Sequence, residues 1–256
     1  MEWSKIKTIL ILLMLAVNIF LSINLYSQVS GSIREEHDMT EHSGEILKSH
    51  GFAFFEDAFL DMPVSMTSYT FRRDIEAEAK AAQGLLGECE QAQQGGGIYQ
   101  YSSSKGKVIF RSSGYIELEW LSEDEPDIEA LLMPGLNEDA LSLKKETEGY
   151  SLYMDGLKIV GAFVSDRHSG KETFAEGVWV YGQKERGAIS RTRAELILAL
   201  GDVMKKLNLT SIDALKSAYI LSPLQNGDVR LTPVWLVVSG DELVYVSALT
   251  GQQITS

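Results

Sequence analysis

The chain contains four histidines, and three of them, His37, His42 and His50, lie close together after an apolar N-terminal run. Two imidazoles that bind one zinc ion from a helix are usually four residues apart, whereas these spacings are five and eight. We therefore expect solvated surface histidines and no metal ion. The acidic residues around them would favour the imidazolium form, which leaves a pH sensor as the alternative.

Ser102 and Lys105 match the S-x-x-K pattern, in which a lysine activates a serine nucleophile. The same spacing recurs at Ser4 and Ser142, and the companion SDN and KTG motifs are absent from the sequence. The stretch "SSSKGK" instead predicts a hairpin turn, and the glycine run 95–97 predicts a loop. The sequence also lacks a G-x-S-x-G, G-x-G-x-x-G, P-loop or H-E-x-x-H motif. We expect no catalytic residue, no cofactor and no enzymatic activity.

Cys89 is the only cysteine, so the chain cannot form an intramolecular disulfide. Its setting, "GECEQAQQGGG", predicts an exposed position and an unreactive thiol, with an intermolecular disulfide as the alternative.

The formal net charge is -13, and 45% of the residues are hydrophobic. This composition is typical of a chain that folds around an apolar core. Binding to nucleic acid depends on basic residues that neutralise phosphates, so an acidic protein of this kind is not expected to bind nucleic acid.

Residues 6–26 form a nearly continuous apolar run. As a helix this run would be about 31 Å long, which is enough to cross a bilayer core of about 30 Å. A signal peptide has a shorter apolar stretch, although "VSGS" after the run weakly suggests a cleavage site. Lys5 lies just before this run and Lys7 at its start, so the positive-inside rule predicts a single-pass protein of the cell membrane with residues 1–5 in the cytoplasm and residues 27–256 outside.

One side of this expected helix carries two hydrogen-bonding side chains. The residues on it follow one another at spacings of four and three, and we call them the helix seam: Ile11, Leu15, Asn18, Ser22 and Leu25. An interhelical hydrogen bond in lipid contributes about 0.6–2 kcal/mol, which is enough to influence the choice of partner. The seam therefore predicts a contact with another membrane helix, and a simple anchor is the alternative.

The rest of the chain predicts an α+β fold in two lobes, 27–135 and 136–256, each an antiparallel sheet with a helix. In the first lobe we expect a short helix that ends at Gly51, then a strand within 65–74. Asp74 and Gly87 are expected to cap a helix over 75–87, and alternating residues over 95–120 predict an antiparallel meander. The acidic stretch 121–139 is expected to connect the lobes.

The second lobe repeats this layout. It predicts a short helix over 137–149 capped by Asn137, and paired strands over 150–182. Thr192 and Glu195 predict a capping box for a helix over 193–209, whose apolar stripe is Leu196, Leu200, Val203 and Leu207. Two strands joined at "SGDE" complete the lobe, and Pro233 predicts that the first of them lies at a sheet edge.

Met1-Glu2-Trp3-Ser4-Lys5, followed by Lys7-Thr8-Ile9 and at once by the apolar run, resembles the N-terminus of the YycI proteins of Gram-positive bacteria. The resemblance implies extracytoplasmic lobes similar to YycH and PepSY modules, and a regulator of the WalK/WalR cell-wall two-component system without catalysis of its own. The implied partners are a WalK-like sensor histidine kinase, a YycH-like protein and the membrane. On this interpretation Trp3, Ser4, Lys5 and Lys7 are the family signature at the membrane interface.

Two other functions remain open at this point. The lobes could form a PepSY-like module that binds and inhibits an extracytoplasmic cell-wall hydrolase or protease. Alternatively, the chain could be a membrane-tethered enzyme with an unfamiliar site, which would require a pocket with converging titratable groups.

Overall fold

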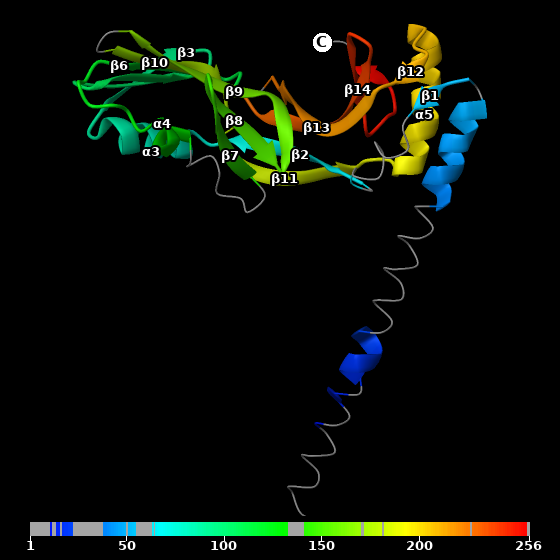
Figure 1. Ribbon diagram of the computed structural model, residues 1–256. Coiled ribbons are helices and arrows are strands. Elements are labelled where there is room, and N and C mark those ends of the chain that lie inside the picture. Colours follow the sequence, from blue (N-terminus) through cyan, green and yellow to red (C-terminus); the bar gives the residue numbers. More distant parts are fainter. Residues whose placement is uncertain are drawn as a thin grey trace, which may run out of the picture.

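A computed structural model describes residues 11, 14–15, 17–22, 38–49, 51–54, 63, 65–132, 141–169, 172–180, 182–225 and 227–254. The described part is mostly sheet with a few helices, which confirms the predicted α+β class (Figure 1).

Fourteen of the described strands form one sheet, whose main path runs in the order β11-β2-β14-β13-β9-β10-β6-β5-β4-β3. The bounds along this path are β11 (Gly182–Ile189), β2 (Thr67–Arg73), β14 (Val229–Ser239), β13 (Ala214–Pro223), β9 (Leu157–Ser169), β10 (Glu172–Val178), β6 (Tyr115–Trp120), β5 (Gly106–Phe110), β4 (Ile98–Ser103) and β3 (Glu90–Gly95). Strands β7 (Leu141–Glu146) and β8 (Gly149–Met154) join through β9, and β15 (Glu242–Ser247) and β16 (Gln253–Ile254) join through β14. A separate parallel pair consists of β1 (Ala53–Phe54) and β12 (Ser211–Ile212).

Strand pairing does not divide at the expected lobe boundary. That boundary, between residues 135 and 136, lies outside the described residues, but strands from its two sides are neighbours. β6 pairs with β10, and β2 pairs with both β11 and β14. The two halves of the chain are therefore interleaved in one sheet.

The described residues form two hydrophobic cores, and the first lies where α3 (Ile75–Leu86) and α4 (Ile128–Leu132) cover one face of the sheet (Figure 1). The predicted caps of α3 are confirmed: the Asp74 carboxylate accepts hydrogen bonds from two backbone N–H groups of the first turn, and Gly87 ends the helix at φ +76°. The predicted meander is also confirmed, because β3 to β6 follow one another as antiparallel hairpins.

The second core lies between α5 (Arg193–Leu207), helical residues 38–49 and strands β14 and β15. The capping box of Thr192 and Glu195 is present, and the predicted stripe is buried at three positions, with Leu207 only partly covered. Leu47, from residues 38–49, is 3% exposed within this core. A Cβ atom added to Gly201 would lie 2.8 Å from Leu47 Cδ2, so glycine permits the close approach to α5.

The predicted helix over 137–149 is wrong. Its proposed cap, Asn137, lies outside the described residues, and 141–146 form strand β7, which pairs with β8 from Leu141 opposite Met154 to Glu146 opposite Gly149. Leu141 and Leu143 are two residues apart, which places both side chains on the sheet face that packs on the first core.

The expectation that Pro233 marks an edge strand is also wrong, because β14 has neighbours on both sides. β13 pairs along one side, while the other side pairs with β2 at 229–231 and with β15 at 234–239. Pro233 lies where that second side changes partner, and its carbonyl oxygen accepts a 2.9 Å hydrogen bond from the N–H of Ala248. Proline has no backbone N–H, but at this position its absence removes no hydrogen bond between paired strands.

Strand β11 forms one end of the main path and pairs only with β2 among the described strands. Its register shifts between Arg186 and Ile189, and most of its residues are exposed. A Cβ atom added to Gly187, within the shift, would lie 2.5 Å from Ser68 Oγ. The strand is therefore bulged at a position that favours glycine.

Candidate functional site

The helix seam lies partly within the described residues. Ile11, Leu15, Asn18 and Ser22 are helical and exposed, and Leu25 lies outside the described part. The signature residues Trp3, Ser4, Lys5 and Lys7 also lie outside it. Over the residues that can be placed, no helix is both long and apolar enough to span a membrane, and the expected span 6–26 falls only partly among them.

The sequence motifs with catalytic capacity do not form a site. Ser102 Oγ accepts a hydrogen bond from Gln100 Nε2, whereas Lys105 Nζ lies 5.8 Å from the ring centroid of Trp120. Lys105 belongs to the predicted hairpin turn between β4 and β5. The serine and the lysine therefore have separate surroundings and do not form a nucleophile pair.

The histidines and Cys89 form no metal site within the described part of the chain, where no group of three potential ligands comes together. His42 is exposed, with its Nδ1 atom 3.7 Å from Glu45 Oε2, and His37 and His50 lie outside the described residues. The expected exposure of Cys89 is wrong, because its side chain is partly buried against the first core and burial raises the pKa of the thiol.

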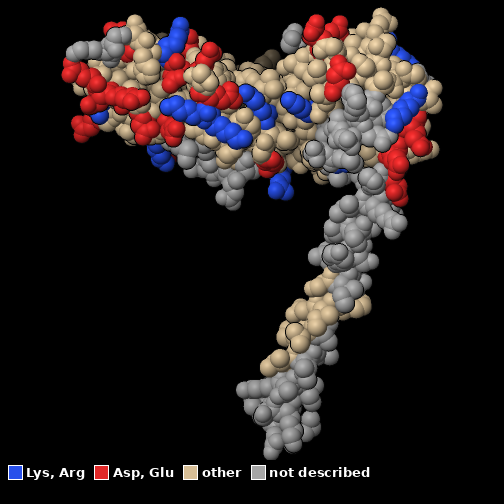
Figure 2. Space-filling view, viewed as in Figure 1, with Lys and Arg blue, Asp and Glu red and all other residues tan. Residues whose placement is uncertain are grey.

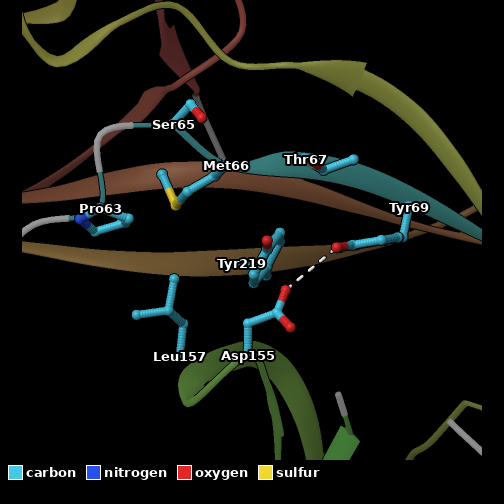
Figure 3. Close-up of a pocket in the computed structure, with 8 residues that line it drawn as sticks. All are labelled: Pro63, Ser65, Met66, Thr67, Tyr69, Asp155, Leu157 and Tyr219. Atoms are coloured by element: carbon cyan, nitrogen blue, oxygen red, sulfur yellow. Dashed lines mark hydrogen bonds between the residues drawn. The ribbon is translucent and has the colours of Figure 1, made fainter. Parts of the chain in front are cut away.

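A pocket of about 390 Å³ lies where β2, β13 and the β8–β9 turn meet (Figure 3). We call it the tyrosine pocket. Its lining combines two aromatic rings, a carboxylate, two aliphatic hydroxyls and three apolar side chains: Pro63, Ser65, Met66, Thr67, Tyr69, Asp155, Leu157 and Tyr219. Pockets of about 300–1,000 Å³ are of a size that holds small ligands.

The polar centre of the tyrosine pocket is formed by side chains from three elements. Tyr69 on β2 donates a hydrogen bond from its hydroxyl to Asp155 Oδ2 at 3.2 Å. Asp155 lies in the turn between β8 and β9 with φ +51°, followed by Gly156 at φ +79°. Tyr219 on β13 is 1% exposed, and its ring centroid lies 6.1 Å from that of Tyr69. Figure 3 shows the three side chains facing one another.

Burial, followed by the nearby groups of the pocket, raises the pKa values of both tyrosines. Burial raises the pKa of Tyr69, and the charge of Asp155 and its hydrogen bond raise it further, against smaller opposing effects of Lys184 and Arg186. Burial also raises the pKa of Tyr219, and the nearby Tyr69 and Asp155 raise it further. Both phenols therefore remain protonated at neutral pH and act as hydrogen-bonding groups instead of bases. This arrangement is suited to binding.

Sequence reasoning did not find this pocket, since Tyr69 and Asp155 are 86 positions apart in the chain. One local signal was present: Asp155-Gly156 between two apolar runs is a typical two-residue hairpin turn, which places the aspartate at a defined sheet end. Which tyrosines face that turn depends on strand order, and strand order has no local signal that can be read from one sequence.

Arg73 and Glu78 form a second buried polar cluster. The guanidinium Nε and Nη2 atoms donate to the two carboxylate oxygens at 2.7 and 2.9 Å, and Nη1 donates to the carbonyl oxygen of Gly97 at 2.6 Å. The backbone N–H of Arg73 donates to Asp228 Oδ1. Burial raises the pKa of Glu78, and its bonds to Arg73 oppose that rise. The cluster joins β2, α3, the β3–β4 hairpin and the segment before β14, and these bonds give it a structural role.

Comparison with known proteins leaves the family of this chain open. No protein-family model and no curated protein matches it. Among solved structures, it is similar to an uncharacterized protein from Eubacterium rectale ATCC 33656, with 12% sequence identity and a TM-score of 0.36 over 76% of this chain and 87% of that chain. So low a TM-score does not establish a shared fold.

Proposed function

We propose that this protein is a non-enzymatic regulator, anchored in the cell membrane by its N-terminal helix, that changes the activity of a WalK-like sensor histidine kinase together with a YycH-like partner. In this proposal the β-rich body is extracytoplasmic and similar to PepSY and YycH modules. The resemblance of residues 1–9 to the YycI proteins motivates the choice of partner.

One observation carries the proposal: a helix whose described side chains are almost all apolar and all exposed. Ile11 is 66% exposed, Met14 64% and Phe20 65%. Large apolar side chains exposed together along one element indicate a lipid or protein contact surface. Asn18 and Ser22 lie on the same helix and provide hydrogen-bonding groups that lipid does not satisfy.

Regulation through such a helix requires no catalytic residue. A helix that prefers one state of a kinase by about 1–3 kcal/mol changes the equilibrium between its states about 5- to 150-fold. The hydrogen bonds available to the Asn18 and Ser22 side chains are within this energy range.

The proposal is tested by crosslinking in membranes followed by co-purification. The unmodified chain is compared with the double variant Asn18→Leu/Ser22→Leu and with a chain whose residues 6–26 are replaced by an unrelated membrane helix. We expect a sensor kinase to co-purify with the unmodified chain and to be lost in both variants. A matched control, Val17→Leu/Leu21→Val, changes the same helix outside the seam and should retain the kinase. Retention of the kinase in all variants would rule out control through the seam.

A second candidate function is a PepSY-like module that binds and inhibits a cell-wall hydrolase or protease, and the tyrosine pocket favours it. In that case the helix replacement should leave the function intact, whereas changes in the pocket should abolish it. The unmodified chain and the helix replacement, assayed for bound hydrolase, distinguish the two functions.

A further inference from the structure

We propose that the tyrosine pocket binds an alkylammonium or alkylguanidinium group, carried by a lysine or arginine side chain of a partner polypeptide. This inference is independent of the helix seam. It rests on the chemistry of the pocket and on the bonds that its polar groups leave unused.

The polar groups of the pocket have unused capacity for a cation. Tyr69 donates to only one oxygen of Asp155, Oδ2, and none of the other lining residues donates to the second oxygen (Figure 3). The hydroxyl of Tyr219 is likewise not hydrogen-bonded to another lining residue, although this side chain is 1% exposed. A carboxylate oxygen and a phenol oxygen both accept hydrogen bonds from an ammonium or guanidinium group.

The ring of Tyr69 adds a second attraction for a cation. An ammonium or guanidinium group within about 6 Å of a ring centroid is stabilised by the negative face of the ring. The structure contains an internal example, because Lys184 Nζ lies 5.4 Å from the ring centroid of Tyr69. Tyr219 also lines the pocket but is only 1% exposed, so its ring is covered by the protein and the contact with a cation falls to the ring of Tyr69.

The rest of the pocket suits the apolar stem of such a ligand. Met66, Leu157 and Pro63 line it with apolar surface, and the volume of about 390 Å³ exceeds that of an ammonium group alone. Lysine and arginine bury their methylene stems against apolar surface and place the charge at the end. A side chain with part of its backbone therefore matches the pocket better than a small free amine.

The charge of the whole protein favours the same class of partner. Its formal net charge is -13, and Figure 2 shows acidic side chains gathered at the end of the molecule that carries β6, β10 and α3. A band of basic residues also crosses the middle of this face (Figure 2). The long-range field still attracts a cationic segment, while Asp155 provides the negative charge inside the pocket.

The test is isothermal titration calorimetry of the full chain in detergent micelles. The probes are N-acetyl-lysine methylamide, its uncharged analogue N-acetyl-norleucine methylamide, which has the same four carbons but lacks the ammonium group, and butylamine. We expect the lysine derivative to bind, the norleucine derivative to bind at least about fivefold more weakly, and butylamine to bind more weakly than the lysine derivative.

Three variants assign this binding to the pocket. Asp155→Asn keeps the turn, because asparagine also tolerates a positive φ, and should weaken binding about fivefold. Tyr219→Phe keeps the ring and should weaken it about tenfold, since it removes a hydrogen bond to a charged group. Asp241→Asn makes the same charge change at the exposed β14–β15 turn and should have no effect.

Circular dichroism confirms the folding of each variant before titration. Equal affinity for the lysine and norleucine derivatives, or unchanged binding in folded Asp155→Asn and Tyr219→Phe, would overturn the proposal. Equal affinity for butylamine would overturn the assignment to a polypeptide side chain.

Discussion

Arg73 and Glu78 show how a single ion pair holds several elements of this protein together. Their side chains are only 10% and 5% exposed, and the guanidinium also binds the carbonyl group of Gly97. Removing one member of a buried ion pair leaves the other charge without compensation. The pair therefore matters for stability chiefly because the loss of one partner would leave the other as a buried, unpaired charge.

We predict that Glu78→Ala lowers the free energy of unfolding by about 3–5 kcal/mol, measured by chemical denaturation. Glu185→Ala is the matched control, because it breaks the neighbouring ion pair between Arg72 and Glu185. The side chain of Arg72 is 66% exposed and that of Glu185 is 50% exposed. That change should cost at most about 1 kcal/mol. Similar losses in the two variants would contradict the structural role of the buried pair.

At the residue scale, local sequence predicted caps well and long-range contacts poorly. Asp74 and the Thr192–Glu195 box function within one helical turn, so neighbouring residues determine them. The partners of Tyr69 and Arg73 come from distant segments, and the exposure of Cys89 depends on the packing of the first core. These contacts follow from strand order, which has no local signal.

Helices α3 and α5 each contain a glycine, in the last turn of α3 and in the interior of α5, and the two have contrasting surroundings. Gly84 in α3 has no atom within 4 Å of an added Cβ, whereas Gly201 in α5 has Leu47 Cδ2 at 2.8 Å. Alanine in a helix interior is favoured over glycine by about 1 kcal/mol where nothing obstructs the methyl group. Alanine substitution at Gly84 therefore reports helix propensity alone, whereas substitution at Gly201 reports propensity together with packing against Leu47.

We predict that Gly84→Ala raises the free energy of unfolding by about 1 kcal/mol, and that Gly201→Ala raises it less or lowers it, because residues 38–49 must move. In a Leu47→Ala background, Gly201→Ala should regain the full propensity gain, while Gly84→Ala should be unaffected. Thermal and chemical denaturation measure all four changes. An equal gain at both glycines in the unmodified chain would show that the contact between Leu47 and Gly201 is not tight.

At the scale of elements, the sequence predicted most strands of the sheet and misassigned β7. The stretch "LSLKKE" contains two leucines, too few to distinguish a period of 2 from a period of 3.6, and it follows residues that favour a helix start. This stretch becomes a strand because β8 pairs with it in antiparallel fashion along its whole length. The position of Pro233 was misjudged for the same reason, since the gap between β2 and β15 belongs to the assembled sheet.

The whole molecule is organised by a sheet that draws on both halves of the chain. β2, from the first half, lies between β11 and β14 from the second half, and β10, from the second half, lies against β6. Neither half contains all the strands that its apolar side chains need for burial. Cooperative folding of the complete chain follows from this connectivity.

We predict that neither 27–135 nor 136–256 folds when it is produced alone, and that mixing the two restores structure, measured by circular dichroism and amide hydrogen exchange. Each half would leave unpaired strands and uncovered core residues. The complete stretch 27–256 is the control and should give one unfolding transition. A half that folds alone with protected amides would instead support two separate lobes.

The bulged strand β11 gives the sheet a boundary against its own copies. Lys184, Glu185 and Arg186 place charges along the outermost strand, and the register shift after Arg186 disturbs the row of backbone groups that an incoming strand would need. Such charged and irregular edges oppose edge-to-edge pairing, in which the edge strand of another copy would extend the sheet through backbone hydrogen bonds. Extension of the sheet into a second copy, the first step of fibril growth, is therefore opposed by β11 at this end of the main path.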